Sequence, residues 1–187
     1  GHGLSDEKKN RLTEIEKKLI DLSISFSENI AKDKTEVLFS EDELKGLSQN
    51  ELKNLRKNNG SFVITMAYPD INAVMENCSV RTTREIVWKA FNNRAVKENS
   101  PILEEAVHLR NEKALLFGFK TWAEYRLQNR MAKSPKNVMS MYESLIPKLQ
   151  KAAEVEKNEL AIDNIEVADI TPLSLIHISE PTRHTRI

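Results

Sequence analysis

The chain has 187 residues, of which 40% are hydrophobic and 30% are charged, a composition typical of a globular protein with room for a real core. Lysine plus arginine and aspartate plus glutamate each number 28, so the net charge is zero. No overall field attracts such a chain to nucleic acid or to an acidic membrane surface, and we expect neither as a partner.

Cys78 is the single cysteine, which excludes an internal disulfide and fits a reducing compartment. We interpret it as a small, partly buried residue rather than a nucleophile, because no neighbouring histidine or helix start would lower its pKa. The sequence has neither the apolar region of a signal peptide nor an apolar run near the roughly 18 residues that span a bilayer. We therefore expect a cytoplasmic protein, with the mitochondrial matrix as the alternative.

The first predicted helix begins after Ser5, a capping residue, and ends near Lys34. Asp6 and Glu7 suit the positive end of its dipole. Its apolar residues recur every three or four positions, which places them on one helix face. These residues are Leu12, Ile15, Leu19, Leu22, Phe26 and Ile30.

Two short segments rich in β-branched and aromatic residues follow, TEVLFS at 35–40 and SFVITMA at 61–67. The residues between them, from 41 to 57, predict one or two short helices, and Asn58-Asn59-Gly60 supplies turn residues before the second strand. We expect a minor two-stranded β-hairpin inside a mostly α-helical domain.

Helical patterns resume after Tyr68-Pro69. Thr82 and Glu85 have the spacing of a capping box, and Ile86, Val87, Ala90 and Phe91 form a predicted buried stripe behind it. Ser100 followed by Pro101 predicts the start of a further helix, which ends at Gly118. The apolar face expected for that helix contains Ile102, Leu103, Ala106, Val107, Ala114 and Leu115.

The stretch after Gly118 predicts two more helices. Thr121 with Glu124 forms a capping box for a short one, and Ser134-Pro135 begins a long one. Pro147 should kink the long helix, because it removes a backbone donor and crowds the preceding turn. Its expected apolar face contains Val138, Met141, Tyr142, Leu145, Leu149 and Ala152.

Glu104, His108 and Glu112 are the nearest approach to a metal site, since a spacing of four places them on one helix face. A solvated charged face explains the same residues, and we favour that interpretation. The zinc-protease motif H-E-x-x-H does not occur, and neither does a nucleophile elbow, a phosphate loop or a dinucleotide fingerprint. The residues therefore indicate no catalytic, cofactor-binding or metal-binding set.

One long run, CSVRTTREIVWKAFNNRAVKENSPILEEAVHLRNEKALLFGFKTWAEYRLQNRMAKSPKNV, resembles the N-terminal helical region of the thimet oligopeptidase and neurolysin family of zinc metallopeptidases. The resemblance extends back through FSEDELKGL and Tyr68-Pro69 to the first helix, and it covers roughly residues 4 to 160. It is more specific than any short motif.

The resemblance implies a two-lobed, almost all-helical enzyme that cuts short peptides in a deep channel. It also implies a zinc site, with H-E-x-x-H, in the C-terminal half of the family's chain. None of those positions exists here, so we carry over no catalytic, cofactor-binding or metal residue. We expect an N-terminal fragment that lacks its catalytic lobe, is monomeric, holds no zinc by itself and is inactive alone.

The last segment, 172–187, differs from the rest in composition, having no lysine, and LSLIHISEPTRH looks like a translated sequencing adapter. We expect 1–3 to be an uninformative terminus, 4–171 to be the helical lobe and 172–187 to be a non-native tail. The alternative to a peptidase fragment is a free-standing helical interaction module, whose exposed apolar faces bind a partner helix or peptide.

Overall fold

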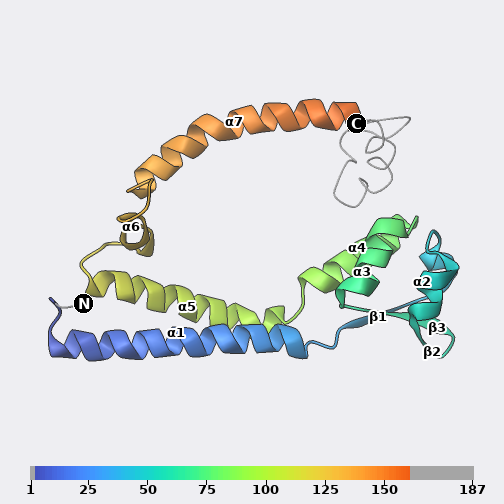
Figure 1. The fold of residues 1–187 in the computed structure, drawn as a ribbon, viewed down its shortest axis with the longest axis horizontal. Helices are drawn as coiled ribbons and strands as arrows, with labels where there is room; N and C mark the ends of the chain where they lie inside the picture. Colours follow the sequence, from blue (N-terminus) through green and yellow to red (C-terminus); the bar gives the residue numbers. More distant parts are fainter. Residues whose placement is uncertain (1–2, 161–187) are drawn as a thin grey trace. The chain divides into compact units, whose positions relative to one another are not determined.

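A computed structural model describes residues 3–160 (Figure 1). The predicted non-native tail, 172–187, and the end of the predicted lobe lie outside the described residues. The described residues divide into two compact units, the first made of residues 3–33 and 95–150 and the second of residues 34–94 and 151–160. We describe each unit by itself.

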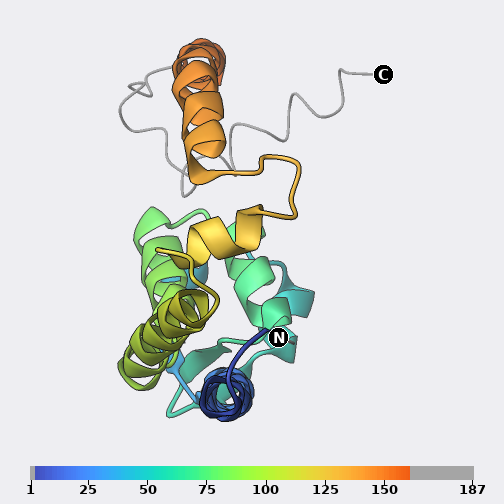
Figure 2. The same cartoon turned by 90° about the vertical axis from the view of Figure 1, so that its left-hand side faces the viewer.

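The first unit is a pair of long antiparallel helices followed by two more. Helix α1 (Asp6–Lys32) and helix α5 (Val96–Leu116) lie side by side in both views (Figures 1 and 2). Helix α6 (Trp122–Leu127) contacts the end of α5, and helix α7 (Pro135–Leu160) begins in this unit. The prediction of a mostly helical fold is confirmed.

Local sequence rules explain most helix ends of this unit. The side chain of Ser5 accepts a hydrogen bond from the Lys8 amide at the start of α1, as predicted. Gly118, with φ of 81°, ends α5, because its amide donates to Leu115 O and the next amide donates to Ala114 O. These two bonds satisfy carbonyls that the helix leaves without partners.

The two later caps are also present. The Thr121 hydroxyl accepts from the Glu124 amide (3.1 Å), while the Glu124 carboxylate reaches back to the Lys120 amide instead of the Thr121 amide. The Ser134 hydroxyl accepts from the Asn137 amide (3.2 Å) at the start of α7. Helix α7 continues on both sides of Pro147, and the kink expected there stays a prediction.

The predicted start of α5 at Ser100-Pro101 is wrong. The helix begins at Val96, and Pro101 lies inside it. The residue before the helix, Ala95, has a left-handed backbone (φ of 51°), and its amide donates to the Asp33 carboxylate at 2.8 Å. A distant carboxylate, rather than a local hydroxyl, thus supports the helix start, and the Ser100 hydroxyl donates to Val96 O instead (2.8 Å).

The second unit contains a three-stranded antiparallel sheet, with strand order β1-β3-β2. Strands β1 (Glu36–Phe39) and β3 (Ser61–Thr65) match the two predicted segments. The prediction of only two strands is wrong, because β2 (Arg56–Asn58) pairs with the other edge of β3. All three β2 residues are polar and exposed, so they show no alternation that would reveal a strand.

The second unit also contains four short helices: η1 (Asp42–Leu44), α2 (Gln49–Asn54), α3 (Tyr68–Asn77) and α4 (Arg81–Asn92). The predicted capping box at Thr82 is wrong, because α4 begins after Val80 with no side-chain cap. The neighbouring Thr83 is buried and donates to Glu43 O (2.7 Å), a tertiary contact in the first turn of α4. The core of the unit includes Phe39, Leu44, Phe62, Ile64, Val74 and Val87.

Candidate functional site

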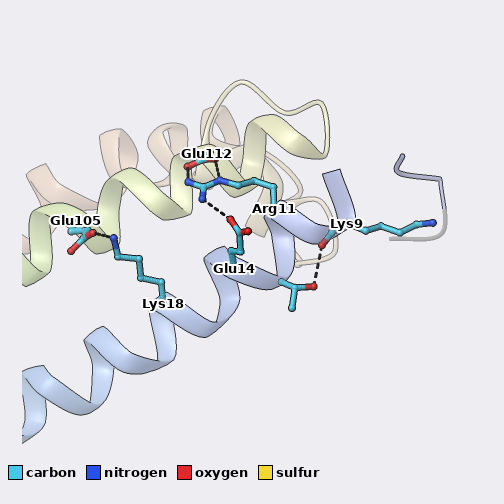
Figure 3. Close-up of polar contacts among 7 residues, drawn as sticks. Lys9, Arg11, Glu14, Lys18, Glu105 and Glu112 are labelled. Atoms are coloured by element: carbon cyan, nitrogen blue, oxygen red, sulfur yellow. Dashed lines mark hydrogen bonds and ion pairs between the residues drawn. The ribbon is translucent and has the colours of Figure 1, made fainter. Parts of the chain in front are cut away.

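A row of ion pairs joins α1 to α5 along the exposed edge of the helix pair (Figure 3). The guanidinium of Arg11 binds Glu112 through two nitrogens, with distances of 2.6 and 2.9 Å, and also contacts Glu14 at 3.0 Å. Lys18 pairs with Glu105 about two turns further along, since each lies seven positions from its counterpart in the first pair. These contacts fix the antiparallel register of the two helices.

The trio Glu104, His108 and Glu112 does not fit a zinc ion. Glu112 uses both of its carboxylate oxygens on Arg11, and those hydrogen bonds hold the pKa of Glu112 below its ordinary value. Glu104 and His108 are exposed. Within the described part of the chain, no group of three or more histidine, cysteine, aspartate or glutamate side chains is placed to hold a metal ion.

Cys78 has the structural role that the sequence suggested, although it is fully rather than partly buried. The thiol of Cys78 donates a hydrogen bond to Glu43 O, with 3.4 Å between Sγ and the oxygen. Burial raises the pKa of the thiol, so the reactive thiolate is disfavoured. Burial and the raised pKa both fit a packing role for this side chain.

A polar contact inside the α1–α5 pair escaped the sequence reasoning. Asn99 is 5% exposed, accepts from the Asn29 side-chain amide (2.9 Å) and donates to Phe26 O (3.1 Å). Two asparagines 70 positions apart give no local signal. This pair satisfies polar groups in the interface between the two helices.

A mostly apolar groove of about 230 Å³ lies between α1 and α5. Its α5 wall includes Leu103, which is 53% exposed, beside the buried Ala106. Arg110 lines one end of the groove. The other apolar lining residues are Leu19, Leu22, Phe26 and Ile102.

The apolar face predicted for α7 is largely uncovered, and the face predicted for α5 is uncovered in part. Val107 and Leu115 of α5 are more than half exposed, and the stripe predicted for α4 also fails at Ile86, which is exposed. Only Val138 among the apolar residues expected on the face of α7 is even half-buried. The exposed ones include Met141, Tyr142, Leu145 and Leu149.

No helix within residues 3–160 is both long enough and apolar enough to cross a bilayer.

These features describe a helical scaffold with uncovered faces, and comparison with known proteins places it among the peptidases. The family model described as "Peptidase family M3" matches residues 74–168, which is half of the chain. The chain therefore belongs to peptidase family M3, as the resemblance of its sequence implied.

Three relatives illustrate the match. The chain is 40% identical to the thimet-like oligopeptidase of Dictyostelium discoideum, over 86% of this chain and 24% of that protein. It is 35% identical to saccharolysin of Saccharomyces cerevisiae, over 79% of this chain and 22% of that protein. It is 32% identical to oligopeptidase A of Haemophilus influenzae, over 86% of this chain and 26% of that protein. The chain thus spans about a quarter of the length of the curated relatives it matches.

Proposed function

We propose that residues 4–171 form the N-terminal helical lobe of a zinc metalloendopeptidase that hydrolyses short peptides. The observation that carries this proposal is the long match to oligopeptidases, which covers 86% of this chain but only 24% of the Dictyostelium relative. The lobe supplies a scaffold, and the catalytic lobe that it needs as a partner comes from elsewhere in the enzyme. Residues 172–187 remain, in this proposal, a non-native tail.

The scaffold role is supported by the way the helix pair is held. Ion pairs along one edge and the buried Asn29–Asn99 contact fix α1 against α5 at several points. A helix pair held at several points suits the wall of a substrate channel. We assign it no catalytic residue.

Zinc belongs to the complete enzyme in this proposal, where it would polarise the scissile carbonyl and activate a water molecule. The described residues do not fit the ion, because Glu112 is engaged by Arg11 and the other two members of the trio are solvated. No reaction step is therefore assigned to this chain. We propose that the chain alone does not hydrolyse peptides, and that the complete enzyme acts as a monomer in the cytoplasm or the mitochondrial matrix.

The test is a cleavage assay of the purified chain with a short fluorogenic peptide, with added zinc and, separately, with a chelator. We expect no turnover above the rate of the peptide in buffer. The full-length thimet-like oligopeptidase of Dictyostelium, assayed beside it, checks that the peptide is a suitable substrate. Turnover by the 187-residue chain that the chelator abolishes would overturn the proposal.

The uncovered apolar side chains also suit the second candidate, a free-standing helical interaction module. The two functions differ in what happens when the remainder of a family member is added as a separate chain. A lobe should bind the remainder and restore chelator-sensitive cleavage, whereas a module should not. Cleavage measured after mixing the two polypeptides therefore separates the candidates.

A further inference from the structure

A cavity of about 240 Å³ in the second unit is lined in part by Lys57, which belongs to the edge strand β2. All of its lining residues fall between positions 41 and 62, inside that one unit. We propose that this cavity and the open edge of β2 bind the C-terminal residue of an extended peptide. The inference rests on the proposed function, which makes short peptides the ligands, and it names the part of the peptide that this lobe holds.

The backbone of Lys57 faces away from the sheet. The turn residues 59–60 both have positive φ (49° and 85°), as in the two-residue turn that closes a tight hairpin. Such a turn joins a hydrogen-bonded pair, here Asn58 and Ser61. Because hydrogen-bonded pairs alternate with non-hydrogen-bonded ones along antiparallel strands, the next pair, Lys57 with Phe62, is of the second kind. The N–H and C=O of Lys57 therefore point to the open side of β2, where the described part of the chain supplies no further strand.

The cavity lies on the face of the sheet to which the Lys57 side chain points. Its buried lining residues are Leu52, Leu55 and Phe62, each at most 8% exposed. The Lys57 ammonium lies 4.3 Å from the centre of the Phe62 ring, so it stands at the wall of the cavity. A peptide residue that pairs with Lys57 shares this face, because residues directly opposite each other on neighbouring strands point to the same side. The side chain of that peptide residue therefore enters the cavity, and an apolar one suits the buried lining.

The charged lining residues favour a carboxylate. Lys53 and Lys57 bring two ammonium groups and Glu41 brings one carboxylate, which leaves one positive charge in excess. In the pairing described above, the last peptide residue donates its N–H to Lys57 O, and one of its carboxylate oxygens accepts from the Lys57 amide. The same carboxylate lies beside the excess positive charge, and hydrogen bonds to an ionised group are the strong ones. An internal peptide residue pairs with the edge equally well but leaves that charge unmatched.

The shortness of β2 also suits the end of a peptide. The strand has three residues, and the alternation leaves only Lys57 with its backbone turned outward. Short edges that carry exposed basic side chains resist the addition of a long strand. The edge therefore accepts one terminal residue better than it accepts a strand from a second copy of the chain.

The test is direct binding of a labelled peptide to the whole chain, measured by fluorescence anisotropy at low salt. The probe is a hexapeptide of glycine and serine that ends in leucine and carries fluorescein at its N-terminus. Its matched control is the same peptide with a C-terminal amide. We expect the amide to bind about tenfold more weakly, because it lacks the charge that the lysines attract. Equal affinities, or no binding of the free acid up to millimolar chain, would overturn the proposal.

Variants of the chain locate the binding. Lys57→Gln should weaken binding of the free acid about fivefold and leave the amide unchanged. Glu41→Gln should strengthen binding of the free acid, because it removes the opposing charge. Lys89→Gln removes an exposed lysine outside the cavity and should change neither affinity. Equal losses for Lys57→Gln and Lys89→Gln would also overturn the proposal, since binding would then follow net charge alone.

The outcome of this experiment is independent of the outcome for the proposed function. Binding is measured on the chain alone, with no cleavage, whereas the proposed function is tested by cleavage after the remainder of a family member is added. Failure of peptide binding would therefore remove this site and leave the assignment of the lobe standing.

Discussion

Single residues in the second unit show how closely its backbone segments approach. Gly46 has φ of 103°, and a Cβ atom there would lie 2.1 Å from Asn77 O and 2.8 Å from the Ser79 amide. The Ser79 amide in turn donates to Lys45 O at 2.7 Å. Only glycine allows the loop before α2 to lie this close to the end of α3.

We therefore predict that Gly46→Ala destabilises the second unit much more than Gly60→Ala does. Both positions have positive φ, but a Cβ atom at Gly60 (φ of 85°) would meet nothing within 4 Å. Gly60→Ala should cost about 1–2 kcal/mol of unfolding free energy through backbone strain alone. Gly46→Ala should cost more unfolding free energy, because the new Cβ atom would also overlap with the backbone oxygen of Asn77. Urea unfolding of both variants measures the difference, and equal losses would contradict the packing seen at Gly46.

At the scale of elements, the pairing of α1 with α5 includes a contact that depends on charge. Hydrogen bonds from Arg11 hold the pKa of Glu112 below its ordinary value, so the ionised carboxylate is favoured in the folded state. A lowered folded pKa gives stability that is complete above the unfolded pKa of the carboxyl. That stability is lost as the pH falls through the folded value.

Glu112→Gln should accordingly lower the urea midpoint of the first unit at neutral pH and low salt. The difference from the unaltered chain should disappear below the ordinary glutamate range, and it should shrink in molar salt because both side chains are exposed. Glu104→Gln, an exposed carboxylate on the same helix, is the matched control and should change little. A Glu112→Gln effect that persists at acid pH would show that the charge is not the cause.

At the scale of the whole molecule, the division into two units should be visible in unfolding. The two tryptophans fall one in each unit, with Trp122 in the first and Trp88 in the second. Single-tryptophan variants, Trp88→Phe and Trp122→Phe, therefore report each unit separately. The effect of a mutation in one unit on the unfolding of each unit can then be measured.

Gly46→Ala should shift the urea midpoint reported by Trp88 and leave the midpoint reported by Trp122 nearly unchanged. Asn99→Ala should do the reverse, because it removes the side-chain oxygen that accepts from the Asn29 amide inside the α1–α5 pair. Leaving a part-buried amide without its acceptor costs on the order of 1 kcal/mol. Fluorescence of the two single-tryptophan chains gives both midpoints, and equal shifts in both would show that the units unfold as one.

The predictable parts of the fold are those whose signals lie within a few residues. Ser5, Thr121 and Ser134 cap helices as the sequence indicated, and Gly118 ends α5 where a left-handed residue was expected. The failures at Thr82 and Ser100 have a shared cause. Each is a good local cap, but residues around these helix starts make contacts with groups distant in sequence, Thr83 with Glu43 O and the Ala95 amide with the Asp33 carboxylate.

In the candidate site, too, local features were predictable from the sequence and contacts between distant residues were not. The sequence indicated that Glu104, His108 and Glu112 share a solvated helix face, but the partner of Glu112 is Arg11, on a helix about a hundred positions earlier. The sequence also could not reveal which apolar faces are covered. Periodicity places Leu103 and Leu145 on apolar stripes, and only the packing shows that both are left exposed.

By itself, the sequence determined the family, the helical class and the helix ends that nearby side chains satisfy, because these depend on residue identity or on contacts within one turn. Tertiary structure alone decided the third strand, the register of α1 on α5 and the groove between them. Those features depend on pairs such as Asn29–Asn99 and Arg11–Glu112, whose members attract each other only once the chain has brought them together.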